Sequence, residues 1–174
     1  MQNQEIEIRE LTIDDADKLT HLRQIALKTN PEAFGSTIEE EKGDDGERFK
    51  KSLETGGYFV LGAFKNSELV GMCGFIQEKR LKTKHKGTIW GMFVQPEARG
   101  LGIGRNLLKS GVEKAFKNEE VEQIILYVVD ENQAACNLYE SFGFKTYGTE
   151  MRALKKDGKY WDEHLMVIFK DDSF

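Results

Sequence analysis

A glycine-rich segment at residues 94–105, VQPEARGLGIGR, constrains the fold of this chain more than any other feature. The apolar run 88–94 before it predicts a strand, and apolar residues recur at helical spacing over 106–117. Glycines at 100, 102 and 104 leave backbone N–H groups uncovered at the first helical turn, where the helix dipole is positive. The segment therefore predicts a strand, a tight turn and a helix whose amino end can hold a phosphate.

The glycine spacing of this segment does not match that of better-known phosphate-binding loops. A P-loop ends in Gly-Lys-Ser/Thr, whereas Gly104 is followed by Arg105 and Asn106, so no nucleotide hydrolysis is predicted. A dinucleotide fingerprint needs a glycine at position 105. A turn that binds no ligand remains an alternative, because three glycines alone are common in turns. The distinguishing order is Arg99, two residues, Gly102, one residue, Gly104.

A second motif, NQAACNLYESFGF, occupies residues 132–144. The two motifs, in this order, resemble the signatures of the GNAT superfamily of acyl-CoA-dependent N-acyltransferases: Arg-x-x-Gly-x-Gly, then Asn and Ala before Leu-Tyr-Glu and Gly-Phe. The stretch DGKYWDEHLMVIF also resembles the closing strand of small acetyltransferases in this superfamily. The resemblance covers residues 5–169 and rests mainly on 58–147.

The resemblance implies that acetyl-CoA is a cosubstrate. The turn N–H groups would bind its phosphates, the Arg99 and Arg105 side chains would add charge, and the pantetheine arm would insert where strand 88–94 separates from strand 123–129. The implied cofactor contacts are Met92, Phe93, Val94, Arg99, Gly100, Leu101, Gly102, Ile103, Gly104, Arg105, Asn132 and Ala135.

The resemblance also implies the catalytic groups. The backbone N–H of Phe93 would polarise the acetyl carbonyl, and Tyr139 would act as the general acid that protonates the departing thiolate. An alternative for Tyr139 is a side chain that only packs in the core. Asn132 would touch the pantetheine arm, although helix capping alone would explain it.

The general base is less defined. Members of the superfamily often carry Glu or His on the strand before the phosphate loop, and residues 88–94 contain neither. His85, just before that strand, is the first candidate, ahead of Glu78. An ordinary surface histidine is the alternative.

Composition and charge limit the class of function. A net charge of −5 and a pI near 5.4 argue against nucleic-acid binding, which needs a basic face. Without a long apolar run or a basic leader, neither a membrane span nor a secretory signal is expected, and the cytoplasm is the expected location. Cys73, Cys136 and the three histidines lack ligand spacing, so no metal is expected.

The chain length predicts one domain over residues 1–174. Successive antiparallel strands followed by a β–α–β crossover predict an α/β (α+β) fold with a central mixed, mostly antiparallel sheet of about six to seven strands and helices on both faces. Strand 123–129 is expected to be buried on both faces. Other expectations are a helix ending at Asn30-Pro31, a poorer helix within 38–53, a helix at 132–142, and strands at 144–147 and 164–169 with a hairpin tip at Asp157-Gly158.

The leading functional hypothesis is an enzyme that transfers acetyl from acetyl-CoA to a primary amine of a small molecule or a peptide N-terminus, by direct attack in a ternary complex. The acidic segment 32–54 mildly favours a cationic acceptor, although a solvated charged helix is the simpler interpretation. The alternatives are a CoA-binding sensor and an interaction module without transferase activity. No nucleic-acid or membrane partner is expected, and a homodimer remains open because exposed sheet edges in such folds often pair.

Overall fold

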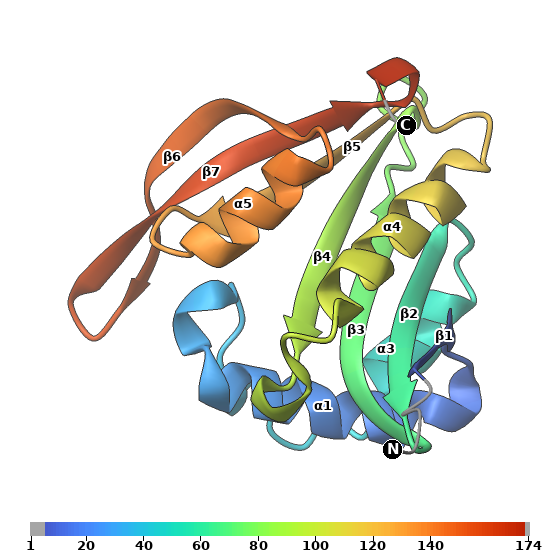
Figure 1. The fold of residues 1–174 in the computed structure, drawn as a ribbon, viewed down its shortest axis with the longest axis vertical. Coiled ribbons are helices and arrows are strands. Elements are labelled where there is room, and N and C mark those ends of the chain that lie inside the picture. Colours follow the sequence, from blue (N-terminus) through green and yellow to red (C-terminus); the bar gives the residue numbers. More distant parts are fainter. Residues whose placement is uncertain (1–5, 173–174) are drawn as a thin grey trace.

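The computed structural model describes residues 6–172 and contains a seven-stranded sheet in the order β1-β2-β3-β4-β5-β7-β6 (Figure 1). The β4–β5 pair is parallel and the other neighbouring pairs are antiparallel, which confirms the predicted mixed, mostly antiparallel sheet. The strands are β1 (Ile6–Glu10), β2 (Tyr58–Lys65), β3 (Glu68–Gln77), β4 (Lys86–Val94), β5 (Gln123–Val129), β6 (Lys145–Lys156) and β7 (Lys159–Phe169).

Helices cover both faces of the sheet, as predicted. On one face α1 (Ala16–Thr29) packs with the short α2 (Ile38–Glu41) and α3 (Glu47–Leu53), and on the other lie α4 (Ile103–Phe116) and α5 (Gln133–Ser141) (Figure 1). No helix within the described residues has the length and apolarity needed to cross a bilayer.

Local sequence signals explain where the first helices begin and end. Thr12 and Asp15 form the capping box that leads into α1, which ends at Thr29, just before Asn30-Pro31. The poorer helix expected within 38–53 is instead divided into α2 and α3. Gly43 and Gly46, with φ of 88° and 87°, adopt left-handed conformations that interrupt a helix.

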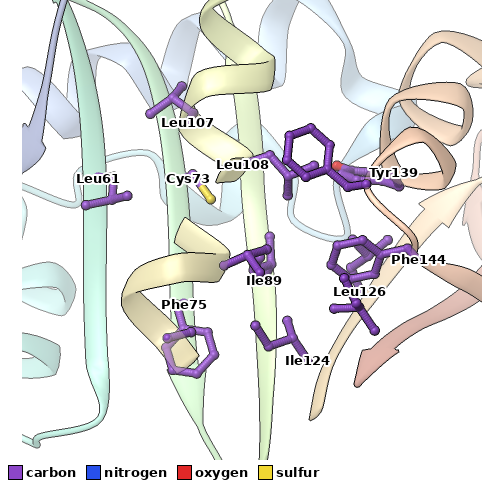
Figure 2. Close-up of a cluster of buried hydrophobic side chains, with 14 of the residues drawn as sticks. Leu61, Cys73, Phe75, Ile89, Leu107, Leu108, Ile124, Leu126, Tyr139 and Phe144 are labelled. Carbon is purple, nitrogen blue, oxygen red and sulfur yellow. The ribbon is translucent and has the colours of Figure 1, made fainter. Parts of the chain in front are cut away.

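The larger core cluster lies between the sheet and α4 with α5 (Figure 2). On β5, Ile124, Leu126 and Val128 are buried toward these helices, whereas Tyr127 is 48% exposed on the opposite face. The expectation that this strand is buried on both faces is therefore wrong. The helices of the α1 face pack on β2 to β4 and leave this part of the sheet only partly covered.

The C-terminal hairpin is longer than predicted, because β6 and β7 extend far beyond 144–147 and 164–169. Its tip is at Asp157-Gly158, as expected, with positive φ at both residues. β6 is an edge strand whose side chains are mostly exposed, so its sequence lacks the alternation that identifies a strand. The hairpin projects from the body of the sheet toward the segment between α1 and α2 (Figure 1).

Candidate active site

The parallel strands β4 and β5 separate partway along their length (Figure 1). They pair only from Lys86 to Thr88, although both continue well beyond this point. Gly91 has a φ of 65°, and the register with β3 shifts beside it, so β4 contains a bulge that turns it away from β5. The resulting gap is a small cavity of about 80 Å³, with Trp90 and Tyr127 among its walls.

A larger cavity of about 350 Å³ adjoins this gap, and Phe34, Met92 and Tyr139 line both. It brings together the end of β4, the glycine turn and α5, so the two sequence motifs meet in space. The predicted residues that line it are Met92, Phe93, Val94, Arg99, Gly100, Gly102, Ile103, Gly104, Asn132, Ala135 and Tyr139.

The glycine turn has the conformation that an anion site needs. Gly100 and Gly102 have φ of 80° and 73°, and a Cβ added at either would meet no protein atom within 4 Å. Gly102 is the N-cap of α4 and has no side chain to cap it, and no acidic residue occupies the first turn. The first N–H groups of α4 are therefore open to an anionic ligand at the positive end of the helix.

Two arginines of the motif have structural contacts. Arg99 donates from Nε to the Val94 carbonyl at 3.0 Å and from its guanidinium to Asn30 Oδ1 at 3.0 Å, which ties the turn to β4 and to the end of α1. Arg105 donates to Ser141 Oγ at 3.2 Å and does not line the cavity. Leu101 is half exposed and lies outside the cavity lining. Arg99 therefore lines the cavity as predicted for a phosphate contact, whereas the structure does not bring Arg105 and Leu101 into the cavity lining.

Tyr139 combines a packing role with access to the cavity. Its ring meets Phe144 edge-on at 6.0 Å within the larger core cluster (Figure 2), and its exposed fraction is only 7%. It also lines both cavities. Burial raises the pKa of the Tyr139 phenol above its ordinary value, so the hydroxyl remains protonated at neutral pH and can serve as a proton donor.

Asn132 caps α5, because its Oδ1 accepts a hydrogen bond from the Ala135 N–H at 3.2 Å. We expect Asn132→Ala to lower the free energy of unfolding by about 1 kcal/mol, measured by urea denaturation. Asn132→Ser, which keeps a capping oxygen, is the control and should recover most of this loss. An alanine variant as stable as the parent would show that the cap does not stabilise α5.

The structure does not bring His85 to the cavity. His85 precedes β4 at its amino end, where its carbonyl accepts from the Glu122 N–H at 2.8 Å. Phe93 is eight positions further along the strand, roughly 25 Å away at about 3.3 Å per residue. Glu78 lies at the same distant end, bonded to the Lys86 carbonyl. Within residues 6–172, no group of three or more His, Cys, Asp or Glu is placed to hold a metal ion.

Glu163, a carboxylate close to the gap, was missed by the sequence reasoning. In the register, Glu163 on β7 lies opposite Val129, which lines the gap, and opposite Glu150 on β6. Burial and the neighbouring Glu150 raise the pKa of Glu163 above its ordinary value. No local sequence pattern identifies Glu163 as a site residue, because its place beside the gap depends on β7 lying between β5 and β6 in the sheet.

Proteins of similar sequence include acetyltransferases. A mycothiol acetyltransferase of Streptomyces scabiei is 30% identical over 129 residues, which make up 72% of this chain and 40% of that protein. A spermidine N(1)-acetyltransferase of Vibrio cholerae is 28% identical over 113 residues, 65% of this chain and 62% of that protein. The chain thus spans about two fifths of the length of the first relative and less than two thirds of the second.

Solved structures share the fold over nearly the whole chain. A GNAT-family acetyltransferase from Streptococcus pneumoniae has a TM-score of 0.82 at 25% identity and covers 95% of this chain and 99% of its own. A Salmonella typhimurium protein, solved with its cofactor acetyl-CoA, has a TM-score of 0.85 at 20% identity, covering 98% and 96%. The sequence model of the acetyltransferase (GNAT) family matches residues 19–144, well over half of the chain. The chain therefore belongs to the acetyltransferase (GNAT) family.

Proposed function

We propose that this protein is an N-acetyltransferase that moves an acetyl group from acetyl-CoA to a primary amine of a small molecule or a peptide N-terminus. One observation carries the proposal: the glycine turn, the β4–β5 gap and Tyr139 border adjoining cavities. Relatives named as mycothiol, spermidine and phosphinothricin acetyltransferases, and a structural neighbour that holds acetyl-CoA, support it.

The residues present fit acetyl-CoA. The open N–H groups after Gly102 would bind its phosphates, and the backbone of Gly100 and Gly102 leaves room for them. Beyond Thr88, β4 has no pairing with β5, so an extended pantetheine arm can lie there as an added strand does. The Phe93 N–H would then donate to the acetyl carbonyl oxygen, where negative charge develops during attack.

The chemistry needs two proton transfers. As the amine nitrogen bonds to the acetyl carbon, a base takes its proton, and Glu163 replaces His85 in that role because of its place beside the gap. When the C–S bond breaks, Tyr139 donates its phenolic proton to the sulfur, and the products are an amide and CoA. A protonated, buried phenol and a half-buried carboxylate with a raised pKa suit these opposite tasks.

We expect Glu163→Gln to lower kcat/KM for the amine by about 100-fold. In the parent, kcat/KM should rise with pH as Glu163 loses its proton. In the variant, the pH dependence of kcat/KM should reflect only the ionisation of the acceptor amine. Glu150→Gln is the control, because it removes the charge next to Glu163. The rise of kcat/KM with pH should then occur at lower pH, and activity should be retained. Parent-like kcat/KM and pH dependence in Glu163→Gln would exclude Glu163 as the base.

The stability of Glu163→Gln shows whether a loss of activity comes from chemistry or from unfolding. A carboxyl whose pKa is raised by folding makes the fold less stable as pH rises from the ordinary carboxyl range through the raised pKa. Glutamine removes that charge and its repulsion by Glu150, so the free energy of unfolding at neutral pH should stay equal or increase. A loss of activity with unchanged stability therefore reports on chemistry.

CoA binding is tested independently of any acceptor. If the proposal is right, CoA at 100 times its dissociation constant adds about 2.7 kcal/mol to the free energy of unfolding, seen as a rise in Tm. Absence of any stabilisation by saturating CoA would contradict the assignment of the cavity.

A further inference from the structure

The bulge that opens the β4–β5 gap has a neighbour outside the sheet, the Arg23 side chain of α1. A Cβ added to Gly91 would meet Arg23 Nη1 at 3.6 Å, so the guanidinium lies against the bulge residue itself. Its Cζ also lies 5.6 Å from the centroid of the Trp90 ring. Arg23 therefore contacts two β4 residues at the point where this strand turns away from β5.

Glu41 fixes the direction of this guanidinium. Arg23 donates from Nε to Glu41 Oε2 at 2.9 Å and from Nη2 to Oε1, so the carboxylate at the end of α2 binds two of the three guanidinium nitrogens. A guanidinium is planar, and two parallel bonds to one carboxylate fix its orientation. The third nitrogen, Nη1, is consequently held against Gly91.

The Arg23–Glu41 ion pair is largely removed from solvent. Glu41 is buried, and most of the Arg23 side chain is enclosed as well. Replacing a buried ion pair by apolar residues is often neutral for stability, so stability alone gives no reason for this pair. Such a pair can instead specify one arrangement of the elements that carry it. These elements are α1 and α2, and Phe34, in the segment between them, also lines the gap.

Trp90 links Arg23 to the wall of the gap. Its ring packs so closely on β3 that a Cβ added to Gly74, its partner in the register, would lie 2.2 Å from a ring carbon. The guanidinium contacts the same ring, and Trp90 lines the gap. The ring is therefore confined by β3 and by α1, and the β4 backbone that follows it diverges from β5 in one direction.

We infer that Arg23 is a positioning residue for the pantetheine arm of CoA. Held by Glu41, it fixes the bulge of β4 and keeps this strand apart from β5. The inference rests on the proposed function, in which the pantetheine arm occupies the gap and the Phe93 N–H contacts the acetyl group. Arg23 itself lines neither the gap nor the glycine-turn cavity, so it acts through the strand and not by touching the ligand.

The test compares two ligands that share their phosphates. CoA carries the pantetheine arm, and 3′-phospho-ADP is the same nucleotide without it. Lysine keeps the positive charge of Arg23 but cannot make two parallel bonds to Glu41. We expect Arg23→Lys to raise the dissociation constant of CoA about tenfold, because the gap must then be ordered on binding. The dissociation constant of 3′-phospho-ADP should not change, and isothermal titration calorimetry measures both.

Arg9→Lys is the matched control. Arg9 donates to the two carboxylate oxygens of the buried Asp15 at 2.7 and 2.8 Å, and its guanidinium lies 4.1 Å from the centroid of the Phe64 ring. This pair joins β1 to the start of α1, and neither residue lines the gap or the glycine-turn cavity. Arg9→Lys should therefore keep the parent affinity for both ligands. An equal loss of CoA affinity in the two lysine variants would overturn the inference.

A double variant distinguishes positioning from stability. Arg23→Met combined with Glu41→Leu removes both charges, so no buried charge is left unpaired and the free energy of unfolding in urea should stay near that of the parent. The double variant also lacks the contact with Gly91, so its CoA affinity should be about as low as that of Arg23→Lys. Parent-like CoA affinity in the folded double variant would overturn the inference, because the pair would then serve packing alone.

The outcomes also separate the inference from the proposed function. If the parent binds CoA and the ratio of the two dissociation constants is the same in Arg23→Lys, the inference is overturned and the transferase remains. If the parent binds neither ligand, the assignment of the cofactor site is overturned and the inference falls with it.

Discussion

Replacing Tyr139 by phenylalanine is expected to lower kcat for acetyl transfer by about 100- to 1,000-fold and to leave CoA affinity almost unchanged. The change removes only the phenolic hydroxyl, while the ring keeps its contact with Phe144 and its place in the core. Without this proton donor, the CoA sulfur must leave as an unprotonated thiolate or take its proton from water. Initial-rate kinetics with saturating acetyl-CoA and a CoA thermal-shift titration measure the two quantities.

Tyr58→Phe is the matched control for this result. Burial raises the pKa of Tyr58 to about 12, and Tyr58 lies on β2, outside both the glycine-turn cavity and the β4–β5 gap. Its variant loses the same hydroxyl from a partly buried position and should keep parent activity. A Tyr139→Phe enzyme with the parent kcat would remove Tyr139 from the mechanism and leave it as a core residue.

The second large effect is expected at the glycine turn, where Gly102→Asp should raise the KM for acetyl-CoA by 100-fold or more. The new carboxylate would stand at the N-cap of α4, in the open space that the phosphates need, and would repel them. It would also cap the N–H groups that should bind the anion. Steady-state kinetics in acetyl-CoA and direct CoA titration report the loss.

Gly56→Asp controls for the backbone conformation. Gly56 also has a positive φ, 65°, with no atom within 4 Å of an added Cβ, but it lies between α3 and β2, outside the glycine-turn cavity. Aspartate adopts this conformation more readily than most residues, so both variants should unfold at similarly reduced denaturant concentrations. Equal losses of CoA affinity in the two variants would show that strain, not phosphate repulsion, causes the effect.

The sequence was most informative where local rules decide the structure. The glycine pattern predicted the turn at Gly102 and the start of α4, and Thr12, Asp15 and Pro31 marked the two ends of the first helical region. The second motif placed Tyr139 on a helix that reaches the same cavity. These predictions succeeded because each depends on capping, φ preference or helical periodicity within a few residues.

Most of its failures concern packing between distant segments, although the division of the helix expected within 38–53 by Gly43 and Gly46 is local. The separation of β4 from β5 was predicted from the resemblance, but the bulge at Gly91 was not, and it is seen only in the pairing with β3. Glu163 becomes a candidate only because β7 lies between β5 and β6 in the sheet. His85 was chosen for its closeness in sequence to the phosphate loop, but the strand between them carries it to the far end of the sheet.

The central claim is acetyl transfer from acetyl-CoA to an amine, and acceptor-dependent release of CoA tests it most directly. The protein is incubated with acetyl-CoA alone and with each of several amino acids, short peptides and simple amines, while free thiol is followed over time. We predict slow background hydrolysis without acceptor and a rate that rises and saturates with at least one amine, with loss of that rate in Tyr139→Phe. A rate that is independent of every amine, in a protein that CoA stabilises, would contradict the account and favour a CoA-binding sensor.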